Sequence, residues 1–277
     1  MSRRTERGTA RYPAAASRRQ AGFALLLVLW SLLLLSIVTT ALNRDARDEL
    51  RLARNGAAAA KAEALADAGI VRAVFGLLNL RPEERWRGDD RPYAFPLGAG
   101  RVDVRVQDEA GLIDLNAAPE ELLASLFSVT GAPDDQAATV ARGIAERRSA
   151  PDLGGPFEAV EALVSLPGMS RELLARAAPF LTVATRQRVV DATVAPMAVV
   201  LALGTDPQAA EAMMAEREGS EATAGAAGRA APSQRRLFRI RAEATVDGAR
   251  FARVAVIRLT YAPERPYLVL SWRRASE

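Results

Sequence analysis

A long run of helix-forming sequence near the N-terminus constrains the fold more than any other feature of this chain. Phe23–Leu42 is 20 residues without a charged side chain, and residues 45–80 contain no proline and carry apolar side chains at helical spacing. At a rise of about 1.5 Å per residue, the apolar run is about 30 Å long as a helix, which matches the hydrocarbon thickness of a bilayer. The sequence therefore predicts one helix over residues 23–80, membrane-embedded in its first third and amphipathic in the rest.

The charge of the chain is divided unevenly along its length. The formal net charge is +4, yet residues 1–22 alone carry six basic and one acidic side chain (+5). Residues 108–180 have five basic and twelve acidic side chains (−7), and residues 235–277 have ten basic and four acidic (+6). A basic leader before an apolar run is held on the cytoplasmic side of a membrane. We therefore expect a cytoplasmic N-terminus and a C-terminal domain across the membrane.

Two residue types are absent, and this excludes several classes of chemistry. The sequence has no cysteine and no histidine, which excludes disulfides, thiol nucleophiles, Cys/His zinc sites and Ser-His-Asp hydrolysis. The single lysine, Lys61, follows alanines rather than a glycine-rich loop, so there is no Walker A phosphate site. No spacing among the 33 acidic residues marks a catalytic pair. We expect a protein that is not an enzyme and requires no cofactor.

The apolar run allows three interpretations. An ordinary secretory signal has a shorter apolar core and a small-residue cleavage site, and residues 43–45 (Asn-Arg-Asp) make a poor one. An uncleaved anchor fits the length of the run. The third interpretation depends on Gly22 and Phe23, at the border between the basic leader and the apolar helix. This pair resembles the cleavage site of a type III (prepilin) signal, which is cut on the cytoplasmic side so that the helix stays attached.

Further segments make the resemblance more specific. They are the strand-like Arg101–Gln107 (RVDVRVQ), then Asp108–Leu126 (DEAGLIDLNAAPEELLASL), Gly155–Val183 (GPFEAVEALVSLPGMSRELLARAAPFLTV) and the terminal strands. With the leader and the long helix, they resemble the K-subunit family of minor pseudopilins in type II secretion (the general secretion pathway). The resemblance covers about residues 19–274. It implies an α+β fold, in which a pilin-like N-terminal helix packs on an antiparallel sheet and an all-α domain of the helix-hairpin-helix or SAM-like kind is inserted.

The resemblance also implies how such a chain is processed. Prepilin peptidase would cut between Gly22 and Phe23 and methylate the new amine of Phe23. Leu27 stands where most pilins carry a glutamate that pairs with the amine of a neighbouring subunit. Loss of this glutamate is typical of the K subunit, which is placed at the filament tip, because a buried carboxylate without a partner costs several kcal/mol. An ordinary lipid-facing leucine is the alternative interpretation of Leu27.

The same resemblance implies partners and a location. The partners are the I and J minor pseudopilins, the major pseudopilin, prepilin peptidase and the inner-membrane assembly platform. With the I and J subunits the chain would form the tip complex that starts and caps the periplasmic pseudopilus for export of folded proteins. The location is the bacterial inner membrane, single-pass, with the C-terminal domain in the periplasm. Family members can bind calcium in the pilin-like domain, but no motif here assigns ligands. The acidic pairs Asp89-Asp90 and Asp108-Glu109 could bind a hard cation, and solvated loop acids are the alternative.

The middle of the chain is predicted to be helical. Short helices are expected near Pro119 with Asn116 as N-cap, over 136–148, over 158–165, over 170–178 with Ser170 as N-cap, over 197–203 and over 207–218.

One turn in this region suggests an alternative function. Leu166–Met169 resembles the turn of a helix-hairpin-helix motif, and the sequence from Leu112 is similar to the DNA-binding repeats of membrane-anchored competence receptors. Non-specific DNA affinity comes mostly from neutralising phosphates. The net charge of this region is negative, and Asp134 and Asp135 lie in Ser128–Gln136, where no upstream hairpin is recognisable. We therefore favour a protein-contact module over a DNA receptor; a plain anchored periplasmic protein is the third possibility.

The C-terminal residues alternate as strands do. Strands are expected over 237–246, 251–259 and 267–272, with a hairpin turn at Asp247-Gly248. Arg239, Arg241, Arg253 and Arg258 are expected on the outward face of this sheet, either solvated or opposite an acidic surface such as the −7 middle of the chain.

The predicted organisation has six parts. They are a leader (1–22), the pilin-type helix (23–80), the first part of the pilin-like domain (81–107), the inserted α-helical domain (108–218), a flexible loop (219–234) and the C-terminal strands (235–277).

Overall fold

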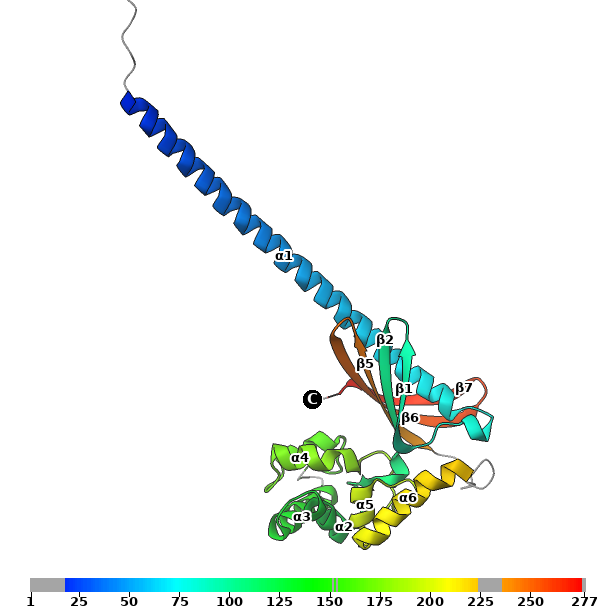
Figure 1. The fold of residues 1–277 in the computed structure, drawn as a ribbon. Helices are drawn as coiled ribbons and strands as arrows, with labels where there is room; N and C mark the ends of the chain where they lie inside the picture. The colour runs from blue at the N-terminus through cyan, green and yellow to red at the C-terminus, as the bar shows by residue number, and fades with distance from the viewer. Residues whose placement is uncertain (1–17, 151, 153, 224–235, 276–277) are drawn as a thin grey trace, which may run out of the picture. The chain divides into compact units, whose positions relative to one another are not determined.

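The computed structural model describes residues 18–150, 152, 154–223 and 236–275 (Figure 1). The leader prediction, apart from residues 18–22, and most of the predicted flexible loop lie outside these residues. The chain divides into two compact units, Met1–Ala57 and Ala58–Glu277.

The long N-terminal helix, α1, comprises Arg18–Leu77. It begins within the leader and ends three residues before the predicted limit. It ends early because the ring of Trp86 lies directly over Gly76, where a Cβ atom would collide with it, and the amide of Trp86 donates to the carbonyl of Gly76 (3.0 Å). The three-residue turn η1 (Pro82–Glu84) follows.

The N-terminal part of α1 is apolar on every side. Large apolar side chains between Phe23 and Val38 are 52–74% exposed. Within the described part of the chain, no helix combines the length and the apolar character that crossing a membrane requires. The predicted span, residues 23–42, includes positions 24, 41 and 42, whose side chains are outside the description. The transmembrane prediction is not supported by the structure and stays a prediction.

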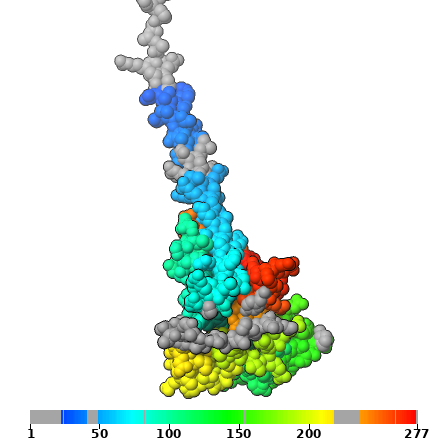
Figure 2. Space-filling view, turned by 90° about the vertical axis from the view of Figure 1, so that its right-hand side faces the viewer, coloured from blue at the N-terminus to red at the C-terminus, as the bar shows by residue number. Residues whose placement is uncertain are grey.

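A five-stranded antiparallel sheet forms the core of the second unit. The strands are β1 (Asp89–Leu97), β2 (Gly100–Asp108), β5 (Leu237–Val246), β6 (Ala249–Ala262) and β7 (Arg265–Arg274), in the order β1-β2-β5-β6-β7. One face packs on residues 58–77 of α1, and the small side chains of Ala66 and Ala73 bring helix and sheet close together. In Figure 2 this cyan end of α1 lies between the teal surface of β1 and β2 and the red surface of β7.

The connection between β2 and β5 is the helical insert. It contains η2 (Glu109–Gly111), β3 (Ile113–Asp114), α2 (Glu120–Val129), α3 (Asp134–Ser149), η4 (Val160–Ser165), α4 (Arg171–Ala177), η5 (Ala178–Phe180), β4 (Leu181–Thr182), α5 (Met197–Ala202) and α6 (Pro207–Thr223). Strands β3 and β4 pair in parallel. The insert has its own core, centred on residues such as Leu126, Phe127 and Ile144, so it is a structural unit distinct from the sheet.

Several local predictions need correction. Strand β1 was not expected; its residues Pro92 and Pro96 are tolerated because β1 is an edge strand, where some amides have no partner. Asn116 does not cap α2. Its side chain donates to the carbonyl of Phe157 (2.9 Å) and accepts from the Phe157 amide (2.7 Å), and α2 begins after Pro119 without a side-chain cap.

Other predictions are correct or differ only in their limits. Ser170 caps α4, accepting from the amide of Leu173 (3.0 Å). Residues 160–165 form a 3-10 helix rather than an α-helix, and α6 extends to Thr223, into the predicted loop. The hairpin turn at Asp247 and Gly248 has φ of 51° and 81°, as a type I′ turn requires.

Candidate functional site

The predicted processing residues lie on α1. Gly22 and Phe23 are both helical positions, and Phe23 is 69% exposed. Leu27 is 56% exposed, and its carbonyl accepts from the hydroxyl of Ser31 (2.8 Å). These residues share one stretch of a single helix, and most of the side chains that follow Gly22 there are apolar. Their role in processing stays a prediction.

Arg253 attaches α1 to the sheet. Its guanidinium pairs with Asp67 (Nε to Oδ1, 2.7 Å) and with Glu63 (Nη2 to Oε1, 2.6 Å), one helical turn apart. These contacts raise the pKa of Arg253, Asp67 having the largest effect. Arg253 therefore lies on the face that packs on α1, together with Ala255 and Ile257. The prediction that it lies on the outward face together with Arg258 is wrong, because the two positions are five residues apart on β6 and successive side chains of a strand point to opposite faces.

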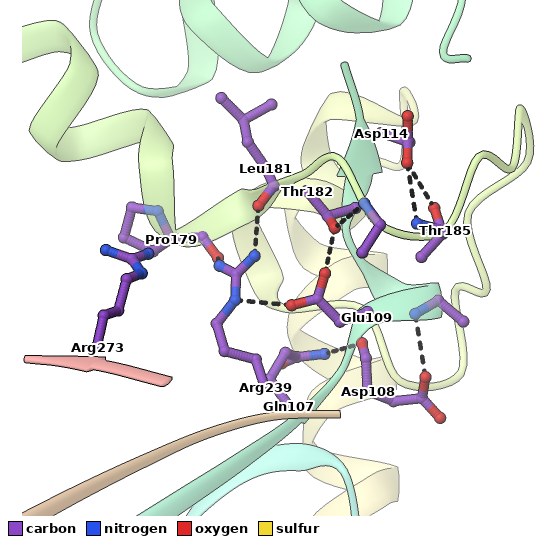
Figure 3. A network of polar contacts seen from close by, with 12 residues as sticks. Gln107, Asp108, Glu109, Asp114, Pro179, Leu181, Thr182, Thr185, Arg239 and Arg273 are labelled. Atoms are coloured by element: carbon purple, nitrogen blue, oxygen red, sulfur yellow. Dashed lines mark hydrogen bonds and ion pairs between the residues drawn. The ribbon is translucent and has the colours of Figure 1, made fainter. Parts of the chain in front are cut away.

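A buried ion pair joins the insert to the opposite face of the sheet (Figure 3). Glu109, in η2, is 1% exposed, and its Oε1 accepts from Nε of Arg239 on β5 at 2.8 Å. The hydroxyl of Thr182 on β4 donates to the other carboxylate oxygen of Glu109. Arg239 also donates to the carbonyls of Leu181 (2.7 Å) and Pro179 (3.3 Å). One arginine thus contacts the start of the insert and the segment around β4 in its middle, which makes the junction specific in position as well as in charge.

Further contacts extend this junction. Gln107 on β2 donates to the carbonyl of Val194 (2.9 Å), and Arg273 on β7 pairs with Glu161 in η4 (2.8 Å). Arg239 and Arg273 both meet acidic side chains of the insert. The interpretation in which the basic sheet faces the acidic middle of the chain is therefore correct at these two points. The sequence singled out Arg239 and Glu109 separately, but nothing in it links two residues 130 positions apart.

The helix-turn-helix segments do not present a surface suited to DNA. The turn between α2 and α3, which sequence did not reveal, has Gly131 at φ 94°; the predicted turn has Gly168 at φ 81°. Asp134 and Asp135 occupy the first turn of α3, and Asp134 accepts from the hydroxyl of Ser128 (2.9 Å). Two carboxylates at the helix start, where backbone amides would meet a phosphate, repel it.

The acidic pairs contact protein groups, and the expected calcium binding stays a prediction. Asp89 pairs with Arg91 (2.9 Å), and Asp90, whose pKa is raised by burial, lies 3.7 Å from Arg105. Asp108 accepts from the amide of Ala110 (3.0 Å), and Glu109 is committed to the junction. Within the described residues, no three acidic side chains converge as metal ligands would. The side chains that could hold a cation are therefore engaged by protein groups.

Comparison with known proteins matches this chain to a solved structure. No family model and no curated protein matches this sequence. A chain of the structure described as "The Crystal Structure of the GspK-GspI-GspJ complex from enterotoxigenic Escherichia coli Type 2 Secretion System" superimposes with a TM-score of 0.50 at 15% sequence identity, covering 84% of this chain and 99% of that chain. The two chains share a fold. The predicted α+β architecture, with a long helix on an antiparallel sheet and a helical insert, is thereby confirmed.

Proposed function

We propose that this chain is a minor pseudopilin of the K-subunit kind in a type II secretion system, without enzymatic activity. The observation that carries the proposal is the fold shared with a chain of a GspK-GspI-GspJ complex over 84% of this sequence. A long helix, a five-stranded sheet and a helical insert between β2 and β5 occur together in the same order as the sequence resemblance implied.

The exposed part of α1 supports a role in assembly at a membrane. Covering a leucine-sized side chain removes apolar surface from water and contributes about 1.5–3 kcal/mol. The run from Phe23 to Val38 exposes more than half of each large apolar side chain, far more than a monomer in water leaves uncovered. Lipid before assembly, and neighbouring subunit helices afterwards, would cover it. Orientation in the bacterial inner membrane with a periplasmic C-terminal domain follows from the +5 leader.

The assembled partners would be the I and J minor pseudopilins, with the major pseudopilin below them and the inner-membrane assembly platform at the base. Leu27 supports placement at the tip. A subunit with no neighbour above it meets no amine that a glutamate at this position could pair with, and leucine avoids an unpaired buried carboxylate. In this position the chain would initiate and cap the pseudopilus. The helical insert, with its own core and its fixed attachment to the sheet, would be the surface that the tip presents.

Processing of the leader tests the proposal directly. Prepilin peptidase would cut after Gly22 and methylate Phe23, so membrane-extracted protein should begin with N-methylphenylalanine. Gly22→Val should leave the leader in place, because the peptidase must accommodate the residue before the cut, whereas Gly8→Val, within the same leader, should be processed normally. Mass spectrometry of the N-terminal peptide shows whether the leader has been removed from the unaltered protein and from each of the two variants. An N-terminus at residue 1 or 2 in the unaltered protein, in cells that contain the peptidase, would refute the proposal.

The alternative, a DNA receptor, predicts a different result. The turns at Gly131 and Gly168 and the sequence similarity from Leu112 support it, and the carboxylates of Asp134 and Asp135 oppose it. We expect no shift of a DNA duplex by the full chain at low salt, where electrostatic binding is strongest. Binding that weakens steeply as salt is added would favour the receptor.

A further inference from the structure

The second unit contains a cavity that the assembly role does not use. Its volume is about 640 Å³, and it lies where β5, β6 and β7 meet the segment that follows β4. Leu237, Leu270, Val183 and Ala184 contribute apolar walls, and Arg186 and Arg258 contribute charge. Asp108 and Thr185, both visible in Figure 3, lie on its lining near the junction. A cavity of this volume with a few polar groups on apolar walls has the size and character of a ligand site.

Arg258 is a positively charged residue on the lining of this cavity. Its Nε is buried and has no hydrogen-bond partner among the described residues. Buried donors are almost always paired, because an unpaired one forfeits its bond to water without replacement. Arg239, on the same face of the sheet, shows the contrast, since its guanidinium donates to a carboxylate and two carbonyls. Because the Nε is closed off, an acceptor that enters the cavity would bond the terminal nitrogens of the Arg258 guanidinium.

Leu270 reaches the cavity through a β-bulge. Val256 pairs with Ser271 and Ile257 pairs with Val269, so Leu270 is an extra residue in β7 without a partner on β6. A bulge redirects the side chain it carries, and bulges are common next to binding sites. Here the bulge places an apolar side chain that is 44% exposed on the wall of the cavity.

Arg186 lies on the lining with a left-handed backbone. Its φ is 54°, a conformation that side chains other than glycine and asparagine avoid. The carboxylate of Asp114 holds it there by accepting from the amides of Thr185 (3.1 Å) and Arg186 (2.7 Å). Its exposed side chain adds a second positive charge to a lining whose single acid, Asp108, already accepts a bond from Ala110.

We propose that this cavity binds a carboxylate carried on a short aliphatic stem, with Arg258 and Arg186 receiving the carboxylate and Leu237 and Leu270 receiving the stem. A single carboxylate matches the excess of one positive charge on the lining. Two sources share this chemistry: the free C-terminus of a chain that ends in an aliphatic residue, and an internal glutamate. The proposal does not depend on the proposed function, because every group that carries it lies within the second unit.

Saturation-transfer NMR on the full-length chain in detergent tests the proposal with 4-methylpentanoate as probe. We expect 4-methylpentanoate to bind and the neutral, isosteric 4-methylpentanamide and inorganic phosphate to bind at least about tenfold more weakly, because the charged hydrogen bond or the stem is missing. Equal binding of acid and amide would overturn the carboxylate assignment, and preferential binding of phosphate would overturn the aliphatic stem.

Variants locate the site. Arg258→Met keeps the aliphatic stem of the arginine and should weaken binding at least about tenfold, while Arg241→Met, an exposed position on the same face, should not. Arg186→Gly removes the second guanidinium and suits the left-handed backbone, so it should fold as well as the parent chain and bind more weakly; Arg188→Ala is its control. Unchanged affinity in both Arg258→Met and Arg186→Gly would overturn the proposal.

Peptide probes distinguish the sources. A tetrapeptide with a free C-terminal leucine, compared with its C-terminal amide, reports a chain end; an amidated peptide with an internal glutamate, compared with its glutamine counterpart, reports a side chain. A loss of binding in either neutral member supports the proposal and names the source. No difference within either pair would overturn it.

Discussion

Removing the charge of Glu109 should weaken the attachment of the insert far more than removing an exposed charge at the same interface. Glu109 is 1% exposed and pairs with Arg239, whose side chain is 20% exposed. Deleting one partner of a buried pair typically costs about 3–5 kcal/mol, because the other charge stays buried. Arg239 retains the carbonyls of Leu181 and Pro179, so we expect Glu109→Gln to cost about 3 kcal/mol, the lower end of that range.

The matched control is Glu161→Gln, which breaks the ion pair with Arg273. Its side chains are 59% and 47% exposed, and such surface pairs contribute about 0–1 kcal/mol. Urea unfolding followed by tryptophan fluorescence measures both variants; Trp86, which stacks on Tyr93 with ring centroids 4.0 Å apart, contributes to this signal. Hydrogen exchange at the amides of Thr185 and Arg186, which donate to Asp114 within the insert, reports the segment that follows β4 next to the junction.

A double variant and the two single costs together test whether burial makes the Glu109–Arg239 pair important. Adding Arg239→Met to Glu109→Gln should recover part of the loss, since the double variant no longer buries an unpaired charge. Costs for Glu109→Gln and Glu161→Gln that agree within about 1 kcal/mol would refute the argument that burial makes this pair important.

Three other predictions concern single positions. Gly69→Ala should destabilise the second unit by about 1–3 kcal/mol, because its Cβ would lie 2.7 Å from Cγ1 of Val102. Gly56→Ala, whose Cβ would have nothing within 4 Å, should be neutral or stabilise α1 by up to about 1 kcal/mol. Thermal unfolding measures both variants. Burial raises the pKa of Asp108 above its ordinary value of 3.8, so its ionised form is disfavoured in the folded state, and the free energy of unfolding should fall as pH rises above that value towards the folded pKa. Asp108→Asn keeps an acceptor for the Ala110 amide without titrating; a pH-stability curve as steep as that of the parent chain would contradict this cause.

The long helix and β5 could be predicted because their sequence signals are local. Residues 45–80 lack proline, and the alternation of Leu237–Val246 coincides with the bounds of β5. Strand β1 was missed for a local reason as well: its two prolines weaken a strand pattern, and only the position of β1 at the sheet edge makes them acceptable.

The junction and the cavity could not be predicted because they depend on what covers each face. Alternation correctly grouped Arg239 with Arg241, yet the first is partly buried against Glu109 and the second is exposed. Asparagine is a residue type that N-cap positions favour, but the side chain of Asn116 forms hydrogen bonds with the backbone of Phe157, 41 residues away. Whether the Nε of Arg258 finds a hydrogen-bond partner depends on which residues pack around it in the fold, and no sequence pattern reveals this.

The pairing of β2 with β5 affects the order in which the protein can fold. Asp108 and Phe238 are direct neighbours in the sheet, although nearly the whole insert lies between them in the chain. Closing a flexible loop of that length costs about 4 kcal/mol in chain entropy before any contact between the strands forms. An insert that folds first shortens the loop that remains to be closed, and the contact between Glu109 and Arg239 then holds β5 at the correct register beside β2. The hairpin of β1 and β2 would remain without its neighbouring strands until the C-terminal strands are synthesised. Folding of the insert would then set the rate at which the sheet is completed.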